Sequence, residues 1–540
     1  MKRPIDPRRY LVQFSSHNLP HIFTDVLIIG GGIAGLSAAL EAAKSVKVTV
    51  VCKEGARDCN TWHAQGGIAA AIAPWDSPEK HFEDTISAGQ QLADPEIVKL
   101  VVERGAERIR EMIKEGFAFD RDNGELAFGQ EGGHGQRRIL HADGDSTGSA
   151  VLKFLLACVK DNPNIQMLTN VFTIDLLDVQ KRCDGVVAYH PDRGVFLVRA
   201  KQTILAAGGC GRIFRETTNS PVATGDGPAM AWRAGVELMD MEFMQFHPTT
   251  LYVAGATRAL ISEAVRGEGG LLVNSRGERF MPNYHESAEL APRDAVSRAI
   301  VEELARTKGT CVYVDVRHIP AKQFKARFPL ITRLCAGFGI DPAHDLIPVR
   351  PAAHYMIGGV KVGQDARTSM PGLFACGEVA CTGLHGANRL GSNSLLEGLV
   401  FGGIAGREAA AAVSTEKEEM FLHSVQGILG EPKYGQLDLE DVGAALRSLM
   451  WRDVGVVRDQ KNLDDAEEMI NFWCRYVMDK IFDSPEGWAL QNMLTTSKLI
   501  AMCARQREET RGVHFRADFP ETKSEWHRHI VVRNSGRGWL

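Results

Sequence analysis

A glycine-rich turn between two apolar segments constrains this chain most strongly. Residues 24–53 read TDVLIIGGGIAGLSAALEAAKSVKVTVVCK, which is an apolar strand, a glycine turn, an alanine-rich helix and a second strand. This βαβ pattern, with G-x-G-x-x-G at Gly30, Gly32 and Gly35, is typical of dinucleotide-binding domains. The first glycine allows a tight turn, the second lets the backbone approach a pyrophosphate, and the third lets helix and strand pack closely. Free N–H groups at the helix N-terminus favour the anion.

The second strand of this unit lacks the acid that usually binds the ribose of NAD. That acid stands about 20 residues after the glycines, where this chain has Cys52, Lys53 and Glu54. A simple NAD site is therefore disfavoured. We expect Lys53 to be a charge partner for the phosphate or ribose region of the cofactor, with a solvated lysine at a strand end as the alternative.

Two later segments extend the same domain. Residues 203–214, TILAAGGCGRIF, read as an apolar strand ending in glycines, and residues 372–406 read as a strand, a Gly-rich loop and a helix. The second segment resembles the one in which flavoproteins hold the ribityl chain with an acid, here Glu378. A helix N-terminus near Ser394 and Leu395 would then stabilise an anionic reduced flavin. Because the pieces are separated, another domain must be inserted between them.

Composition and charge limit what else the chain can bind. With 62 Lys and Arg against 67 Asp and Glu, the formal net charge of -5 gives no general attraction to nucleic acid or anionic lipid. No run reaches the roughly 18 apolar residues of a membrane span. The 11 cysteines form no CxxC pair and no Cys/His cluster at zinc spacing, so we expect reduced thiols, no metal and no iron–sulfur cluster. Residues 1–24 lack a secretory signal, which predicts a partly disordered start and a cytoplasmic location.

Titratable side chains recur between residues 240 and 355, where short mixed elements replace the regular pattern. The candidates for inward-facing groups are His247, Ser262, Glu263, Arg293 and His354. Ligands often bind between domains, and a cap over the nucleotide domain would exclude water from such a site. Each residue taken alone is more simply a loop or surface residue, but their recurrence beside Gly and Pro favours a site.

Several motifs, in order along the chain, carry a resemblance to a known family. They are GGGIAG, HAQGGIAAA, TGDG, QFHPT, SEAVRGEGG, LAPRD, PAAHYMIGG, TGLHGANRLGSNSLLE and QREETRGVHF. Over residues 24–520 the chain resembles the succinate dehydrogenase/fumarate reductase flavoprotein family, in the branch that oxidises L-aspartate. The resemblance implies an α/β fold with an N-terminal extension (1–24), a Rossmann-like FAD-binding domain (25–240 plus 356–420), an inserted α+β capping domain (241–355) and a C-terminal helical bundle (421–540).

The implied reaction is FAD-dependent oxidation of L-aspartate to iminoaspartate by hydride transfer to flavin N5. Oxygen, giving hydrogen peroxide, or fumarate would then accept the electrons. This is the first step of NAD biosynthesis through quinolinate, with functional coupling to quinolinate synthase. A soluble fumarate reductase or succinate dehydrogenase flavoprotein subunit is the alternative, and a non-catalytic flavin-binding protein is a more remote one.

The same resemblance assigns a set of residues to FAD. They are Gly30, Gly31, Gly32, Ile33, Ala34, Gly35, Lys53, Asn60, Thr61, Trp62, His63, Ala64, Gln65, Gly66, Gly67, Asp226, Glu378, Ser394 and Leu395. Relatives that bond FAD covalently do so through a histidine that matches Asn60, whereas His63 lies at a different place. We therefore expect non-covalent FAD.

Dicarboxylate binding is implied for His247, Ser262, Glu263, His354 and Arg389. Two buried negative charges need charge-assisted donors, and the planar arginine fork suits a carboxylate. We expect Arg389 and His354 to bind one carboxylate, and His247 with Ser262 the other.

The catalytic set implied by the resemblance is Arg293, Glu263 and His247, with Arg293 as the proton carrier. An arginine that only stabilises charge is the alternative, because a free guanidinium has a pKa above about 12.

The segment FGQEGGHGQRRILHADGDSTG, residues 128–148, collects many charges among glycines. In the succinate and fumarate relatives the position of Glu131 resembles a glutamine, so we expect this carboxylate to pair with the α-ammonium of L-aspartate. An exposed glutamate in a mobile loop is the alternative. The glycines read as hinges of a closing loop, and His134, Arg137, Arg138 and His141 read as structural or flavin-side contacts.

Residues 421–519 are charged and amphipathic at helical spacing, which predicts a helical bundle. Five arginines there read most simply as a solvated face that packs partly on the flavin domain, namely Arg447, Arg452, Arg458, Arg505 and Arg511.

Overall fold

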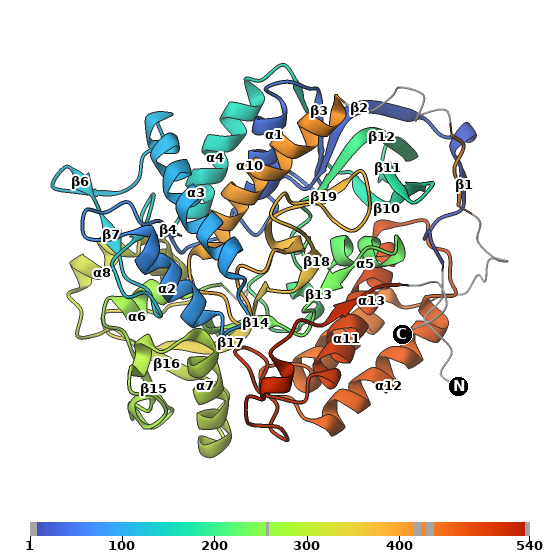
Figure 1. Ribbon diagram of the computed structural model, residues 1–540. Helices are drawn as coiled ribbons and strands as arrows, with labels where there is room; N and C mark the ends of the chain where they lie inside the picture. Colours follow the sequence, from blue (N-terminus) through green and yellow to red (C-terminus); the bar gives the residue numbers. More distant parts are fainter. Residues whose placement is uncertain (1–7, 255–258, 415–422, 428–436, 535–540) are drawn as a thin grey trace.

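The centre of the computed structural model is a seven-stranded sheet (Figure 1), and the structure describes residues 8–254, 259–414, 423–427 and 437–534. Parallel pairing joins β12 (Gly194–Leu205) to β2 (His21–Ile29), β2 to β3 (Val48–Val51), β3 to β9 (Ile165–Leu168), and β12 to β19 (Leu373–Ala375). The antiparallel strands β10 (Phe172–Val179) and β11 (Arg182–His190) extend the edge beside β12. The three sequence segments predicted to share one domain are therefore strands of one sheet.

Two helices pack on this sheet with their backbones unusually close. Cβ atoms added at Gly402 and Gly406 of α10 (Asn393–Val413) would stand 2.5 Å from Ala34 O and 2.3 Å from Ala38 O of α1 (Ile33–Ala42). Contacts advance in the same direction along both helices, so α1 and α10 run parallel. Their N-termini, each carrying free N–H groups, therefore point the same way, and α10 begins before the level of the first turn of α1, which packs beside Gly398 and Gly402.

A second hydrophobic core lies under the inserted segment. Its antiparallel sheet has the order β14 (Met244–Leu251), β17 (Ile347–Met356), β16 (Val312–Asp315) and β15 (Leu271–Val273). The helices around it are α6 (Glu263–Gly267), α7 (Arg293–Thr307), α8 (Ala321–Arg327) and α9 (Pro329–Ala336). Because its apolar residues cluster separately from those of the main sheet, this part folds around its own core. Figure 1 shows it at the lower left.

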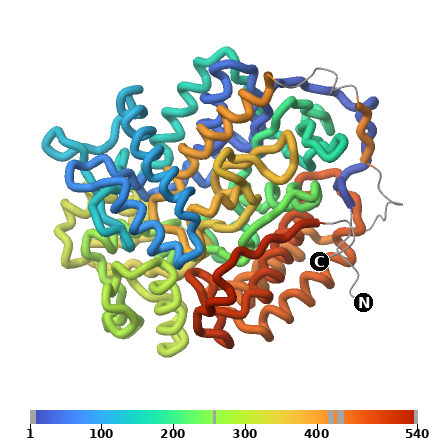
Figure 2. The backbone as a smooth tube through the Cα atoms, viewed as in Figure 1, coloured from blue at the N-terminus to red at the C-terminus, as the bar shows by residue number. Residues whose placement is uncertain are grey.

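The C-terminal part is helical, as expected, and α11 (Leu439–Asp453), α12 (Gln460–Val477) and α13 (Pro485–Gln506) pack against one another (Figures 1 and 2). The expectation of a solvated face is wrong for two of the five arginines. Arg458 is fully buried and donates to Glu242 O at 2.7 Å, and Arg511 pairs with Glu509 at 2.7 Å. The expected boundary after residue 420 lies outside the described residues.

Within the expected N-terminal extension, the residues that the structure describes, from residue 8 onward, are more ordered than we expected. Strand β2 begins at His21, inside the expected extension, because its first residue pairs with Leu197 of β12. Tyr10, Leu11 and Phe14 are buried against the outer strands of the main sheet. The described part of the extension is thus packed by its apolar side chains.

The remaining strands and helices are β1 (Phe14–Ser15), β4 (Ile68–Ala69), α2 (Pro78–Ala88), α3 (Pro95–Lys114), β5 (Arg121–Asp122), β6 (Glu125–Leu126), β7 (Phe128–Gly129), β8 (Ile139–Leu140), α4 (Thr147–Lys160), α5 (Asp226–Arg233), β13 (Leu238–Met239), β18 (Gly359–Lys361), β20 (Ala380–Cys381), β21 (Gln426–Gly427) and β22 (Val531–Val532). Among the helices that the structure describes, none has both the length and the apolar character needed to cross a membrane.

Candidate active site

A cavity of about 950 Å³ lies at the carboxyl ends of the parallel strands, where α1 and α10 begin. This edge is the usual ligand site of open α/β sheets. Sixteen of the residues assigned to FAD line the cavity, namely Gly30, Gly31, Gly32, Ile33, Ala34, Lys53, Asn60, Thr61, Trp62, His63, Ala64, Gln65, Asp226, Glu378, Ser394 and Leu395. The cavity therefore collects residues from all three segments of the main sheet.

Three other glycines of the predicted FAD set do not line the cavity. A Cβ at Gly35 would stand 2.0 Å from Gly30 O, and one at Gly67 would stand 2.4 Å from Leu140 O. Gly66 lies beside the carboxylate of Glu131. Close backbone packing explains Gly35 and Gly67, as the sequence predicted for Gly35.

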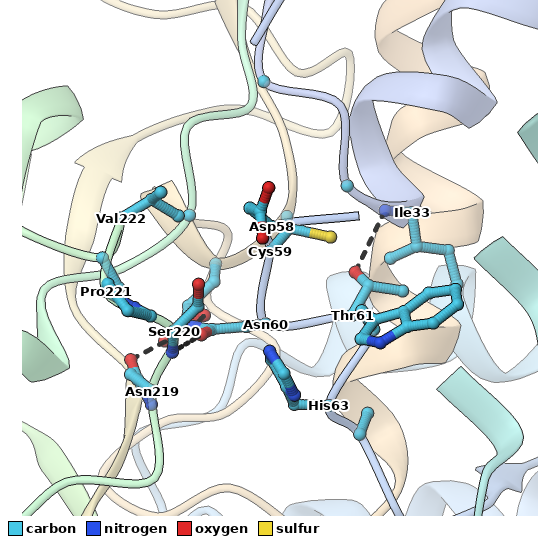
Figure 3. Close-up of a pocket in the computed structure, with 18 of the residues that line it drawn as sticks. Ile33, Asp58, Cys59, Asn60, Thr61, His63, Asn219, Ser220, Pro221 and Val222 are labelled. Atoms are coloured by element: carbon cyan, nitrogen blue, oxygen red, sulfur yellow. Dashed lines mark hydrogen bonds between the residues drawn. The ribbon is translucent and has the colours of Figure 1, made fainter. Parts of the chain in front are cut away.

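The start of α1 fits a pyrophosphate. Gly30 has φ +115°, and a Cβ there would stand 2.1 Å from Ala206 O, so only glycine fits the turn. Figure 3 shows the Ile33 N–H donating to Thr61 Oγ1, a bond of 3.1 Å. This helix N-terminus lies on the cavity wall and has the donors that an anion needs.

Asn60 is held by a hydrogen-bonded cluster (Figure 3). Its amide donates to Asn219 Oδ1 and to Glu378 Oε2, both at 3.1 Å, and its carbonyl oxygen accepts from Ser220 N at 2.9 Å. Burial raises the pKa of Glu378. The position that the resemblance matches to the attachment histidine of relatives thus carries an amide whose nitrogen and oxygen both have hydrogen-bond partners. This fits FAD held without a covalent bond.

Lys53 is not a solvated lysine. Its ammonium donates to Thr224 Oγ1 at 2.8 Å and to Asp226 Oδ2 at 2.9 Å, and it lies 5.0 Å from the centre of the Phe172 ring. Asn492 of α13 donates to the other oxygen of Asp226 at 2.8 Å. The C-terminal helices therefore help to fix this part of the cavity wall.

The predicted substrate residues converge from separate elements on one buried polar cluster. Arg293, at the start of α7, donates to Glu263 Oε2, at the start of α6, at 2.5 Å. The rings of His247 on β14 and His354 on β17 lie 5.1 Å apart. Of the predicted substrate-binding and catalytic residues, only His354 and Arg389 line the cavity, and Glu131, His247, Ser262, Glu263 and Arg293 lie buried outside its wall.

Burial and nearby arginines favour the uncharged form of both histidines of the cluster. The Thr249 N–H donates to His247 Nδ1 at 3.2 Å, which places the ring proton on Nε2. This Nε2 is buried and has no hydrogen-bond partner among the described residues. Burial and Arg293 hold the pKa of His247 well below its usual value, and burial with Arg389 does the same for the pKa of His354.

The pKa values of the two glutamates of the cluster are shifted in opposite directions. Burial and Glu263 raise the pKa of Glu131. Burial also acts to raise the pKa of Glu263, but Arg293 and Arg266 outweigh it and lower that pKa overall. Burial, followed by Arg293, lowers the pKa of Arg389 to about 10. One carboxylate is therefore matched by arginines, and the other is not.

Ion pairs and hydrogen bonds anchor residues 128–148 in this structure, and the closing motion expected of their glycines stays a prediction. Arg138 is fully buried between Asp76, at 2.8 Å, and Asp84, and Asp145 accepts N–H bonds from the first turn of α9. A buried guanidinium needs such ion pairs, and they hold the loop in place. His134 and His141 are also buried, whereas Arg137 is exposed.

Sequence reasoning missed three residues of the cluster. Gln245 Oε1 accepts from both Arg293 and Arg389 at 3.2 Å, and Arg266 pairs with Glu263 at 3.4 Å. Alternation along β14 puts residue 245 on the same face as residue 247, and Arg266 follows Glu263 by one helical turn. Those two signals could have found them, but nothing marked the third, Ser392, which bonds Glu131 at 2.8 Å.

Known proteins are similar to this chain along nearly its whole length. Residues 25–395 match the family described as FAD binding domain, and residues 443–538 match the one described as fumarate reductase flavoprotein C-term. L-aspartate oxidase of Bacillus subtilis is 42% identical over 516 residues, which cover 95% of this chain and 94% of that protein. L-aspartate oxidase of Streptomyces coelicolor is 40% identical over 536 residues, covering 95% and 92%. The solved structure of E. coli quinol fumarate reductase FrdA, in a mutated form, has a TM-score of 0.87 at 31% identity and covers 95% of each chain. The chain therefore belongs to the L-aspartate oxidase family of FAD-binding flavoproteins.

Proposed function

We propose that this chain catalyses the FAD-dependent oxidation of L-aspartate to iminoaspartate, the activity named for its relatives. The observation that carries the proposal is a buried carboxylate oxygen, Glu131 Oε1, with no hydrogen-bond partner among the described residues. It belongs to a cluster otherwise rich in donors for carboxylates. An anionic oxygen there can pair with the ammonium group of L-aspartate, whereas succinate has no cationic group for it to bind.

The two carboxylates of the substrate need donors, because burying a charge without partners is costly. Arg389 and His354, on the cavity wall, would bind one of them. The free Nε2–H of His247 and the hydroxyl of Ser262 would bind the other. Ser262 Oγ accepts from Ala264 N at 3.3 Å, which leaves its hydrogen available to donate.

Glu131 and Arg293, the latter bonded to Glu263, are the residues that we assign to proton transfer. Oxidation removes a proton from the substrate ammonium, and Glu131 Oε1 is the acceptor that this proposal assigns. The raised pKa of Glu131, caused by burial and Glu263, suits a group that takes up a proton. Arg293, bonded to Glu263, is the proposed proton carrier when fumarate is reduced.

FAD supplies the two-electron acceptor when it is bound. The residues proposed to hold it are those that line the cavity, with the α1 N-terminus for the pyrophosphate and Glu378 for the ribityl chain. We further propose oxygen and fumarate as the final acceptors, and a quinolinate-forming enzyme as the consumer of iminoaspartate.

An anaerobic half-reaction tests the proposal. The FAD-loaded protein is mixed with L-aspartate or with succinate, and flavin absorbance is followed without oxygen. We expect bleaching by L-aspartate only, and peroxide once air is admitted. Bleaching by succinate without a response to L-aspartate would instead establish the fumarate reductase or succinate dehydrogenase alternative.

A further inference from the structure

The residue before α10 has an uncommon conformation and an unusual partner. Ser392 stands at the N-cap but has φ 60° and ψ 2°, a left-handed conformation that residues with a Cβ seldom adopt. An N-cap serine normally accepts from the first turn of its helix. The Ser392 hydroxyl makes no such bond and donates to Glu131 Oε2 at 2.8 Å.

A buried relay of hydrogen bonds holds the backbone at this point. Arg138 donates to His134 Nδ1 at 3.1 Å, which leaves the proton of the ring on Nε2. His134 Nε2 then donates to Gly391 O at 3.0 Å, and Ala69 N donates to Ser392 O at 3.1 Å. Arg138 is in turn fixed by two aspartates. The left-handed turn is therefore anchored on both sides of Ser392.

We propose that Ser392 is a positioning residue for substrate specificity, which holds Glu131 so that Oε1 stays free for the substrate ammonium. The inference deepens the proposed function and rests on it. Oε1 lies beside Gly66, where an added Cβ would stand 3.4 Å away, so the segment that carries the FAD residues borders this oxygen.

A competing contact explains why Glu131 needs such a partner. Arg293 Nη2 lies 3.9 Å from Glu131 Oε2, with Glu263 and Arg389 also facing the carboxylate. Without the serine hydroxyl, the Glu131 carboxylate would be free to turn toward Arg293 and pair with it directly. A carboxylate paired with arginine would attract the ammonium more weakly. Ser392 thus keeps the charge of Glu131 available.

The test compares Ser392→Ala and Ser392→Gly in the FAD-loaded enzyme. Both remove the hydroxyl, and the glycine also accepts the positive φ without strain, so it keeps the test valid if the alanine variant folds poorly. We expect a roughly tenfold or larger loss of kcat/KM for L-aspartate, in line with a buried hydrogen bond to a charged group. Inhibition by succinate should stay within about twofold. Ser414→Ala, at the exposed other end of α10, is the matched control.

Two further readouts separate positioning from a general structural effect. In a Glu131→Gln background, Ser392→Gly should cost no more than about a further twofold, because the pair acts as a unit. The acidic limb of the pH profile of kcat/KM for L-aspartate should move to lower pH, because direct pairing with Arg293 lowers the pKa of Glu131 more than the Ser392 hydroxyl does.

The inference is overturned if succinate inhibition weakens as much as kcat/KM for L-aspartate falls. It is also overturned if Ser392→Gly lowers kcat/KM in the Glu131→Gln background as much as in the parent enzyme, or if it leaves L-aspartate turnover unchanged. If the parent enzyme does not oxidise L-aspartate, the proposed function fails and this inference falls with it. If the parent oxidises L-aspartate and only the Ser392 variants behave otherwise than expected, this inference alone fails.

Discussion

Replacing Glu131 with glutamine should separate substrate specificity from stability. The side chain is only 2% exposed, its Oε2 is held by Ser392 at 2.8 Å, and its Oε1 is unpaired among the described residues. Losing one partner of a buried charge pair costs about 2 to 5 kcal/mol. Because glutamine keeps an acceptor oxygen, we expect a cost at the lower end of this range, about 2 to 3 kcal/mol. This corresponds to roughly a 30- to 150-fold loss of kcat/KM for L-aspartate.

Steady-state assays with L-aspartate as donor and, separately, with fumarate as acceptor measure the effect. Fumarate has no ammonium, so its reduction by an artificial donor should fall less than about threefold. Glu103→Gln, on the exposed face of α3, is the matched control. Equal losses on both substrates would refute the assignment of Glu131 to the ammonium.

The same substitution should not destabilise the protein. The pKa of Glu131 is raised in the folded state by burial and Glu263, so the folded protein holds a proton that the unfolded chain releases above the ordinary carboxyl value of about 4.3. The wild-type residue therefore costs stability as pH rises above that value. Relative to wild type, the glutamine variant should gain stability between about pH 4 and pH 7 in urea unfolding, and a growing loss over this range would contradict the pKa direction.

Three other perturbations test separate parts of the site. Arg293→Gln should reduce fumarate reduction by roughly 100-fold or more, since Glu263 loses its 2.5 Å partner, and undiminished reduction would remove Arg293 from the proton path. Gly512→Ala should raise the KM for L-aspartate, because Gly512 has φ +54° and a Cβ there would stand 2.2 Å from Ala387 O, close to Arg389; an unchanged KM would contradict this. Denaturation should release all FAD into the supernatant, because the amide of Asn60 has no nucleophilic ring nitrogen, whereas yellow colour in the protein pellet would show a covalent bond.

The main sheet was predictable because its information is local. Apolar runs, glycine turns and an alanine-rich helix each lie within about 30 consecutive residues of a βαβ unit. The assignment of three separated segments to one sheet was confirmed by the pairing of β12 with β2 and β19. The start of β2 at His21 was missed because its partner, Leu197, lies far along the chain.

The burial of charged side chains could not be predicted from the sequence. Arg138, Arg458 and Arg511 look like solvated residues in any local pattern, since charged side chains are mostly exposed. Their partners, Asp76, Glu242 and Glu509, lie in most cases far away in the sequence. Only the folded chain shows that Arg138 and Arg511 are paired with carboxylates and that Arg458 donates to backbone carbonyl groups.

Specificity in this site follows from which carboxylate remains unmatched. Glu263 is paired with Arg293 at 2.5 Å and with Arg266 at 3.4 Å, so its charge is already balanced within the protein. Glu131 lies 3.9 Å from Arg293 and is bonded only by a neutral hydroxyl, on one of its two oxygens. A dicarboxylate without an ammonium would leave that carboxylate buried and unpaired, which is unfavourable. L-aspartate brings the missing cation, so the same residue that favours the amino acid also disfavours succinate.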